Sequence, residues 1–321
     1  MTQATGSASS IAIQLEQTWG VLPLTPKLIE INASTYGESI SVESDELVSN
    51  AINPNRGILD TRSGQVKVKG SVPFELPVKN SDLIIYGLLG DMVQTDVTIL
   101  GTPKKKKVFK RAQTLPSFLI QKGFHDINQF FKYSGCKINN MQLTVEPTGL
   151  ATGSFEIIGK DCNVSTTSFD ATPTKYVHKV YSAIDSVILE NGAGALFTNF
   201  NFNITNGLYD SRIIGSRHSA NIGPGKSEVT GELSIMFENV DLYNKWLNET
   251  QTNLKITFTS GKDSIEFLFP KVKLNGEASP KIENQEGINI SFKWRALVDV
   301  GGYDSDVVIT IINDVDFNDL M

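Results

Sequence analysis

The chain has 321 residues, of which 40% are hydrophobic and 20% charged, a composition typical of a folded protein with room for two domains of ordinary size. Its net charge of −6 excludes a globally basic nucleic-acid binder, and no apolar run approaches the roughly 18 residues of a membrane helix. The N-terminus has neither a basic start nor an apolar core of signal-peptide length, so we expect a protein made and used in a cytoplasm, without a membrane partner.

The first half of the chain is expected to be mostly β-structure. Residues 65–74 alternate polar and apolar side chains, and the same pattern, rich in β-branched and aromatic residues, recurs in residues 137–145 and 150–159. Residues 81–91 predict a helix, because their apolar run is too continuous for a half-exposed strand. Residues 125–133 also predict a short helix with an aromatic face.

The second half repeats this composition. Its one predicted helix covers residues 239–250 and places Leu242, Trp246 and Leu247 on one face. The predicted strands are 197–205, 228–237, 253–259, 264–274, 288–298 and 306–312. Many strands with a few short helices indicate a mainly β (α+β) fold.

A strongly basic segment follows the first predicted helix. Residues 101–113 include Lys104, Lys105, Lys106, Lys107, Lys110 and Arg111. Such a run is typical of a nucleic-acid patch or of a solvated loop or hairpin, and we favour a loop or hairpin that contacts another subunit.

The charge of the chain is also divided between its halves. Residues 1–165 hold 16 Lys/Arg and 15 Asp/Glu, a net of +1, whereas residues 166–321 hold 13 and 20, a net of −7. No basic residue follows Arg295, and six aspartates do. We therefore expect the basic segment of one subunit to meet the acidic end of its neighbour in a directional stack.

The sequence GPGKS, residues 223–227, matches the end of a relaxed phosphate-binding loop that would begin at Ala220. A phosphate loop needs a helix after it, because the helix N-terminus supplies the N–H groups that hold the phosphates. Here the next residues alternate as a strand does. We predict a turn that leads into a strand, and no nucleotide binding.

Two similar units occur in the chain. Val-x-Gly, an alternating strand, a short turn and Asp-Leu opening a helix appear from Val68 and again from Val229. Gly70 and Gly231 are 161 positions apart. We predict a tandem duplication with domains at residues 1–165 and 166–321; the alternative is two unrelated units that look alike by chance. Since glycine inside a strand marks a bulge or a close backbone approach, we expect valine at either position to disturb ring closure more than monomer folding.

With these elements in place, the chain resembles the two-domain tail tube proteins of long-tailed bacteriophages. The resemblance is carried by IAIQLEQTWGVLPLTP near the N-terminus, GQVKVKGSVPFELPVKNSDLIIYGLLG, and GKSEVTGELSIMFENVDLYNKW in the second half. Its most diagnostic part is residues 116–159, with an aromatic strand, a short helix, a Tyr-x-Gly turn at residues 133–135 and a Gly-x-Phe strand.

The resemblance implies two tail-tube-like β-barrel or β-sandwich domains, each with a flanking helix, in a structural virion protein. Such a subunit assembles in the host bacterial cytoplasm into homotrimeric, pseudo-hexameric rings, or hexamers as the alternative. The rings stack head to tail into the tail tube through which DNA passes without specific binding. The implied partners are further copies of the chain, the tape measure protein and tail-end proteins.

The resemblance also implies where subunits meet. Long loops at residues 39–65 and 206–227 are expected to reach an adjacent ring. Besides the basic segment, the residues expected at subunit or ring contacts are Arg56, Arg62, Arg212, Arg217 and Lys226.

Nothing local indicates catalysis. The two cysteines, Cys136 and Cys162, and the three histidines are isolated, and no GxSxG, HExxH or CxxC motif occurs. We expect no enzyme activity, no metal and no cofactor. The remaining alternatives are a β-sandwich adhesin or baseplate module that binds a host surface or glycan, and an enzyme that uses the GPGKS segment.

Overall fold

The computed structural model describes residues 3–31, 37–52, 54–276, 279–280 and 287–321. The fold is mainly β, as predicted, with two short α-helices, α1 (Asp82–Leu89) and α2 (Asp241–Leu247). Both helices lie where the sequence indicated them. The predicted strands are also present, with small differences at their ends.

One antiparallel strand order occurs twice along the chain. In the first half the neighbouring strands are β1 (Ser9–Leu15), β7 (Phe118–Phe124), β8 (Gln129–Val145), β9 (Thr152–Gly159), β4 (Thr61–Glu75) and β3 (Ser41–Val48). In the second half they are β11 (Ser186–Glu190), β17 (Thr252–Ser260), β18 (Asp263–Asn275), β19 (Asn289–Ala296), β16 (Glu228–Met236) and β13 (Phe197–Thr205). β10 (Asp161–Ser165) pairs with β8 as β20 (Val308–Asn313) pairs with β18.

The two halves also share an irregularity. In the first, the register steps from Phe118 opposite Cys136 to Ile120 opposite Tyr133; in the second, it steps from Thr252 opposite Val272 to Leu254 opposite Phe269. Each step leaves one extra residue in the longer strand, which is a β-bulge. Gly135 takes a φ of +65° there. The predicted Tyr-x-Gly turn at residues 133–135 is therefore wrong, because these residues form a bulge inside one continuous strand.

The helix predicted for residues 125–133 is also wrong. Residues 125–128 form a turn between β7 and β8, and β8 begins at Gln129. Asn128 has a φ of +49°, which suits a tight turn. The aromatic residues that suggested a helical face lie in a strand that pairs with β7 on one side and β10 on the other, so tertiary pairing overrides the local pattern.

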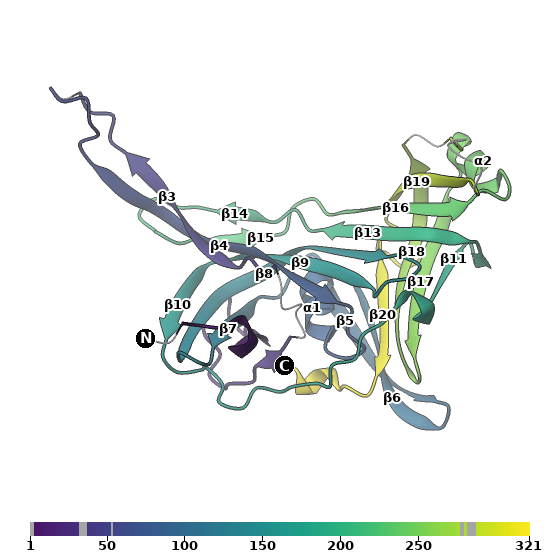
Figure 1. Ribbon diagram of the computed structural model, residues 1–321, viewed down its shortest axis with the longest axis horizontal. Coiled ribbons are helices and arrows are strands. Elements are labelled where there is room, and N and C mark those ends of the chain that lie inside the picture. Colours follow the sequence, from purple (N-terminus) through teal and green to yellow (C-terminus); the bar gives the residue numbers. More distant parts are fainter. Residues whose placement is uncertain (1–2, 32–36, 53, 277–278, 281–286) are drawn as a thin grey trace.

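Two hairpins project from the body of the protein (Figure 1). The longer is the outer part of β3 and β4 with the connecting residues 49–60, and we call it the arm. The other joins β5 (Gly90–Ile99) to β6 (Thr102–Arg111). It follows α1 directly, whereas α2 leads straight into β17, so it belongs to the first half alone.

Two segments tie the halves together. The crossover from β10 to β11 runs back over the first half, where Tyr181 is buried and its N–H donates to the Leu76 carbonyl. At the C-terminal end, β20 pairs with β6. Buried hydrophobic residues from both halves form one continuous core.

The remaining elements are short. They are the 3₁₀ turns η1 (Gly6–Ala8), η2 (Ala183–Asp185) and η3 (Phe317–Asp319), and the strands β2 (Ile29–Glu30), β12 (Ala193–Gly194), β14 (Tyr209–Ser211) and β15 (Asn221–Gly223). No helix in the described part of the chain is long and apolar enough to cross a membrane.

Candidate functional site

A sheet joint connects the two halves of the chain. β13, the outer strand of the second half, pairs with the end of β8 from the first half, in register from Thr205 opposite Asn140 to Phe200 opposite Val145. The order β3-β4-β9-β8-β13-β16-β19-β18 is therefore one unbroken sheet. The two halves are joined by main-chain hydrogen bonds.

The two faces of this joined sheet differ in chemistry. A cross-strand row on the buried face contains Phe74, Gly153, Leu143, Phe202, Gly231 and Trp294. The neighbouring row on the other face contains Glu75, Thr152, Thr144, Asn201, Glu232 and Lys293. Successive residues of a strand point to opposite faces, so one face packs on the core and the other meets solvent.

Cations on the polar face lie beside carboxylates. Lys67 and Lys69 lie 3.7 and 2.8 Å from Glu43. At the other end of the sheet, Lys293 lies 3.7 Å from Glu232, and Arg295 lies 3.6 Å from Glu228. Between these ends, amides and hydroxyls bond across the strands, as Gln142 does to Ser154 and Asn140 to Thr205. The polar face is rich in hydrogen-bonding groups, and these four cations lie beside carboxylates.

The predicted assembly loops lie together. Residues 39–65 form the arm, and residues 206–227 run beside it with the small pair β14–β15 (Figure 1). The Gln65 amide donates to the Ile213 and Ser216 carbonyls, the Val66 N–H donates to the Arg217 carbonyl, and Arg212 contacts Asp45 at 3.1 Å. The second loop therefore braces the first.

The arm carries an apolar surface that nothing in the protomer covers. Leu47, Ile52, Ile58 and Leu59 are 59%, 102%, 67% and 58% exposed. Beside them Ile214, in the bracing loop, is fully exposed. Singly exposed apolar residues are ordinary, but a group of them on a projecting arm marks a contact surface.

The basic segment is strand β6 of a hairpin and not a solvated loop. Its Lys107 side chain is fully buried and pairs with Asp82 at the start of α1. Its ammonium group also donates to Asn313 Oδ1 and the Val315 carbonyl. Burial lowers the pKa of Lys107, although the Asp82 carboxylate opposes the shift. This side chain has no exposed surface for a neighbouring subunit to contact.

The acidic C-terminal end is the partner of this strand within the same protomer. Lys105 pairs with Asp316 at 3.0 Å and Arg111 with Asp306 at 2.8 Å. Lys104 pairs instead with Asp263 at the start of β18. Of the other predicted side chains in β6, Lys110 lies over the Tyr303 ring at 5.7 Å, and no ion pair of Lys106 occurs among the described residues. The basic segment and the acidic end thus pair inside one chain, and the expected pairing between neighbours stays a prediction.

The other predicted contact cations are on or near the arm. Arg56 lies in its tip and Arg62 in its β4 strand, where it is 3.8 Å from Asp60. Arg212 and Arg217 are in the bracing loop, and Lys226 ends it, 83% exposed and 3.5 Å from Glu228. GPGKS is a turn that leads into β16, as predicted, with no helix after it.

Gly70 and Gly231 occupy equivalent close approaches. A Cβ at Gly70 would overlap the backbone of Ser39 and Ile40, and a Cβ at Gly231 would overlap the Asn201 carbonyl and the Trp294 ring. Neither position is at a register step. Every clash is within the protomer, so we expect valine at either position to strain the monomer itself; its effect on ring closure stays a prediction.

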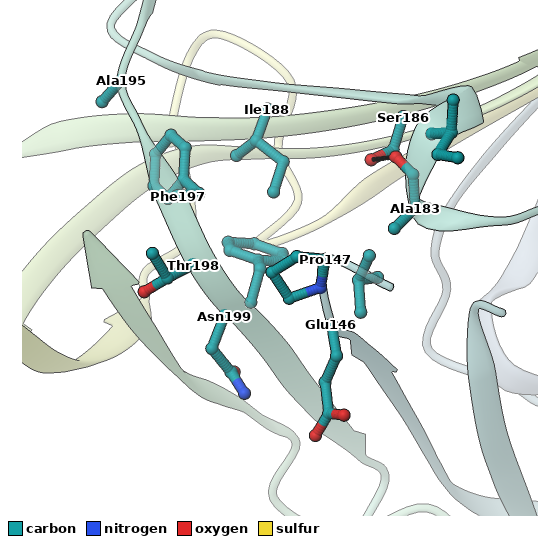
Figure 2. A pocket seen from close by; sticks show the side chains of 12 residues that line it. Glu146, Pro147, Ala183, Ser186, Ile188, Ala195, Phe197, Thr198 and Asn199 are labelled. Atoms are coloured by element: carbon teal, nitrogen blue, oxygen red, sulfur yellow. Dashed lines mark hydrogen bonds between the residues drawn. The ribbon is translucent and has the colours of Figure 1, made fainter. Parts of the chain in front are cut away.

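A small cavity lies where the two halves join, at the end of the sheet farthest from the arm. It measures about 220 Å³ and is lined by the β8–β9 turn, η2, β11 and the first residues of β13. Figure 2 shows Pro147, Ile188 and Phe197 around it, with Glu146 and Asn199 at one border. The pocket is open to solvent and its lining surface is mixed, with somewhat more polar than apolar area, and Ile184 in the lining is 91% exposed.

Sequence reasoning predicted a loop or hairpin for the basic segment, but it missed strand β5 and the pairing of β6 with β20. The run DMVQTDVTIL contains enough β-branched residues to have suggested a strand, but the four lysines that follow indicated solvent. Among the described residues, no three His, Cys, Asp or Glu side chains lie close enough together to hold a metal. Burial raises the pKa of Cys162 to about 11, so its thiol stays protonated at neutral pH.

A family model described as phage tail tube protein matches residues 6–296. The match runs from before β1 to the end of β19, so it includes both occurrences of the strand order and excludes β20. No curated protein matches the chain.

Proposed function

Because the chain belongs to the phage tail tube protein family, we propose that it assembles with copies of itself into stacked rings that enclose a channel for DNA. A structural part of the virion tail is the role that the family supports directly. Ring size, the closing contacts and the lining of the channel are argued below from the geometry of the protomer.

The proposal begins with duplication. The repeated strand order and the repeated bulge support two tandem domains, at residues 1–165 and 166–321. Because Gly70 faces Ile40 as Gly231 faces Phe202, residues 37–43 correspond to residues 199–205. In the same comparison Asn275, the last residue of β18, corresponds to Asn140, the first residue of β8 in the joint.

The joint between β8 and β13 is the single observation that carries the proposal. It joins the first domain to the second. The free edges at the outer ends of the sheet are residues 37–43, which correspond to the β13 side of the joint, and β18, which reaches the start of the β8 side at Asn275. Pairing of these two edges between protomers is the proposed closing contact. Three protomers contribute six similar four-stranded units, so a closed trimer has pseudo-sixfold symmetry and no free edge. A hexamer of protomers is the alternative.

The polar face of the joined sheet is the proposed wall of the channel. DNA binds proteins chiefly through phosphates that are neutralised by free cations. On this face Lys67, Lys69, Lys293 and Arg295 have carboxylate neighbours, and the Lys137 ammonium donates to the Ile222 carbonyl. Such a wall presents hydrogen-bonding groups and little net positive charge, which suits DNA in transit without specific binding.

The remaining parts of the proposal follow from the family. The subunits assemble in the host bacterial cytoplasm and are found in the virion tail, where the tape measure protein and tail-end proteins are the expected partners. These assignments rest on family membership, since the protomer has no feature that identifies those partners by itself.

Negative-stain microscopy of the concentrated protein tests ring formation, and Val42→Pro tests the closing edge. The Ser39 N–H bonds inward to the Ser71 carbonyl, so by strand alternation the Val42 N–H points outward from β3. We expect Val42→Pro to fold but fail to close rings, while Val42→Thr, which keeps the N–H, closes them. A small defined oligomer without rings from the unaltered chain would instead support the adhesin or baseplate alternative.

A further inference from the structure

We propose that Lys107 and Asn313 join in a covalent isopeptide bond inside the protomer, with Asp82 as the group that moves the protons. The three side chains are fully buried and come from three separate elements, β6, β20 and α1. The bond links the first half of the chain to its C-terminal segment. It goes beyond the proposed assembly, because it forms within one protomer.

The register of the sheet brings the amine of Lys107 to the amide of Asn313. Lys107 in β6 lies opposite Ile311 in β20, and Asn313 is two residues further along β20 on the same face. Diagonal neighbours of this kind are about 7–8 Å apart and within reach of a long side chain. Lys107 Nζ donates to Asn313 Oδ1 at 2.7 Å. Because a carbonyl bond is about 1.2 Å long, the Asn313 Cγ lies within roughly 4 Å of the amine, close to an attacking distance.

The oxygen of the Asn313 amide is already polarised. The Val315 N–H donates to Asn313 Oδ1 at 3.0 Å, in addition to the Lys107 ammonium. When an amine attacks an amide carbon, negative charge develops on this oxygen, and a preplaced backbone N–H stabilises that charge. The donor is two residues from Asn313 in the same turn, so the local backbone fixes its position.

Asp82 touches both groups that exchange protons. Its carboxylate contacts the Lys107 ammonium, and its Oδ2 accepts from Asn313 Nδ2 at 3.4 Å. Burial lowers the pKa of Lys107, against the opposing effect of Asp82, and so favours the neutral amine that a nucleophile needs. Full burial of all three side chains also keeps bulk water from the reacting carbon.

The reaction balances without an oxidant or a cofactor. Asp82 takes one proton from the Lys107 ammonium, and the neutral amine forms a bond from Nζ to the Asn313 Cγ. Asp82 passes that proton to Nδ2 and takes a second one from Nζ. The Cγ–Nδ2 bond breaks, ammonia leaves, and the last proton stays on the new amide nitrogen. Asp82 ends protonated, and burial of a neutral carboxyl costs less than burial of an unpaired carboxylate.

The bond makes permanent the contact that holds the two halves together. A buried ion pair adds little net stability, because both charges lose their hydration. A covalent bond has no such cost, and residues 107 and 313 are 206 positions apart. It therefore restrains the unfolded chain as a disulfide across a long loop does. Asn313 lies after residue 296, where the family match ends, so the bond is a feature of this chain's own C-terminal segment.

Peptide mapping of the unaltered protein, denatured after prolonged incubation in the folded state, tests the bond directly. Trypsin does not cleave after an acylated lysine, and no basic residue follows Arg295. We expect a branched peptide in which residues 107–110 are joined to residues 296–321. We also expect an intact mass that is lower by one ammonia than the sequence requires.

Three results of this mapping overturn the proposal. One is an intact mass equal to that of the sequence. Another is loss of ammonia without the branched peptide, because an asparagine that cyclises on its own backbone also loses ammonia. The third is a branch from residues 107–110 to residues 80–104, which contain Asp82, because the electrophile is then the carboxyl group and water is lost.

Three variants test the role of each group, with folding checked by circular dichroism. Lys107→Arg removes the nucleophile, Asn313→Ala removes the electrophile, and Asp82→Asn keeps both but removes the proton carrier. We expect none of them to yield the branched peptide. Lys106→Arg, one residue away in β6, is the matched control and should link as the unaltered chain does. A folded Asp82→Asn chain that links to the same extent overturns the role of Asp82. Where a variant does not fold, the map of the unaltered chain decides.

Discussion

The two domains share a strand order but bury their helices to different extents. In the first, all but one of the eight residues of α1 are buried; in the second, Leu242 is the one buried residue of α2. The difference comes from what lies around each helix. α1 contacts β5 and β6 and approaches the C-terminal segment through Asp82, which bonds Asn313, whereas α2 lies at the outside of the molecule (Figure 1).

This comparison shows which elements of the first half hold the second half. The β5–β6 hairpin of the first domain receives β20 of the second, and Phe317 packs against Tyr86 of α1 and Phe109 of β6. The match to the family ends at residue 296, before this C-terminal segment begins. The strands that both halves share therefore form the joined sheet, while the β5–β6 hairpin and the C-terminal segment hold the two halves together.

The largest expected effect comes from removing the buried charge of Lys107, in the strand where the β5–β6 hairpin pairs with the C-terminal segment. Lys107→Met leaves Asp82 buried without its cation, and removal of one partner from a buried pair costs about 3–5 kcal/mol. We expect a loss of that size in the free energy of unfolding, measured with urea. Lys106→Met, one residue away on the same strand and partly exposed, is the control and should change stability little. Equal effects of the two substitutions would contradict a special role for the buried pair.

The buried pair of Lys107 and Asp82 illustrates what the sequence predicts well and what it does not. Alternation around Gly70 and Gly231, and the spacing of 161, were enough to predict the central strands and the duplication hypothesis. Four consecutive lysines, by contrast, indicate solvent in any local reading. Only the pairing of β6 with a strand 200 residues later turns alternate lysines inward or toward carboxylates, and a local pattern contains no information about that distant partner.

The candidate contact surfaces also differ in how far the sequence predicts them. The position of the arm could be predicted, because the family resemblance implies a long loop at residues 39–65. The bracing of the arm by residues 206–227 could not be predicted, because the contact between Arg212 and Asp45 joins residues that are far apart in the sequence. The cavity between the two halves also depends on the β8–β13 joint. No feature of either strand alone predicts that joint.

The next effect tests whether both domains depend on the same close approach. Gly70→Ala and Gly231→Ala each force a Cβ into neighbouring atoms of the protomer. Overpacking of this kind costs about 1–3 kcal/mol, and we expect a similar loss for the two positions in urea unfolding. Gly194→Ala is the control, because nothing lies within 4 Å of a Cβ there. A large effect at one position alone would show that the domains are not equivalent at this point.

A smaller effect concerns the pH dependence of stability at the contact between the β5–β6 hairpin and the C-terminal segment. Hydrogen bonds from Gln94 and then Lys105 hold the pKa of Asp316 well below its usual range. A carboxyl with a lowered folded pKa contributes stability that is present above its unfolded pKa of 3.8 and is lost as the pH falls toward the folded value. We therefore expect Asp316→Asn to flatten the loss of stability below about pH 4, followed by thermal unfolding across a pH series.

The control for that series is Asp304→Asn, in the same acidic end of the chain but without an ion pair among the described residues. It should leave the shape of the pH profile unchanged. If the two variants have the same profile below pH 4, the pairing of Asp316 with Lys105 does not contribute to stability at the contact between the hairpin and the C-terminal segment.

The smallest expected effect is none at all, at the segment that resembles a phosphate loop. In a phosphate loop the backbone N–H groups converge on the anion at a helix N-terminus. Here the Gly225 N–H donates to the Asn206 carbonyl, β16 begins at Glu228, and the Lys226 ammonium lies 3.5 Å from the Glu228 carboxylate. An incoming phosphate would meet a carboxylate and no helix. We expect no heat of binding for ATP or GTP at millimolar concentration in calorimetry, and no difference between the unaltered chain and Lys226→Ala. Saturable binding with a micromolar constant that is lost in Lys226→Ala would show that this turn, present in the second domain alone, had acquired a function separate from assembly.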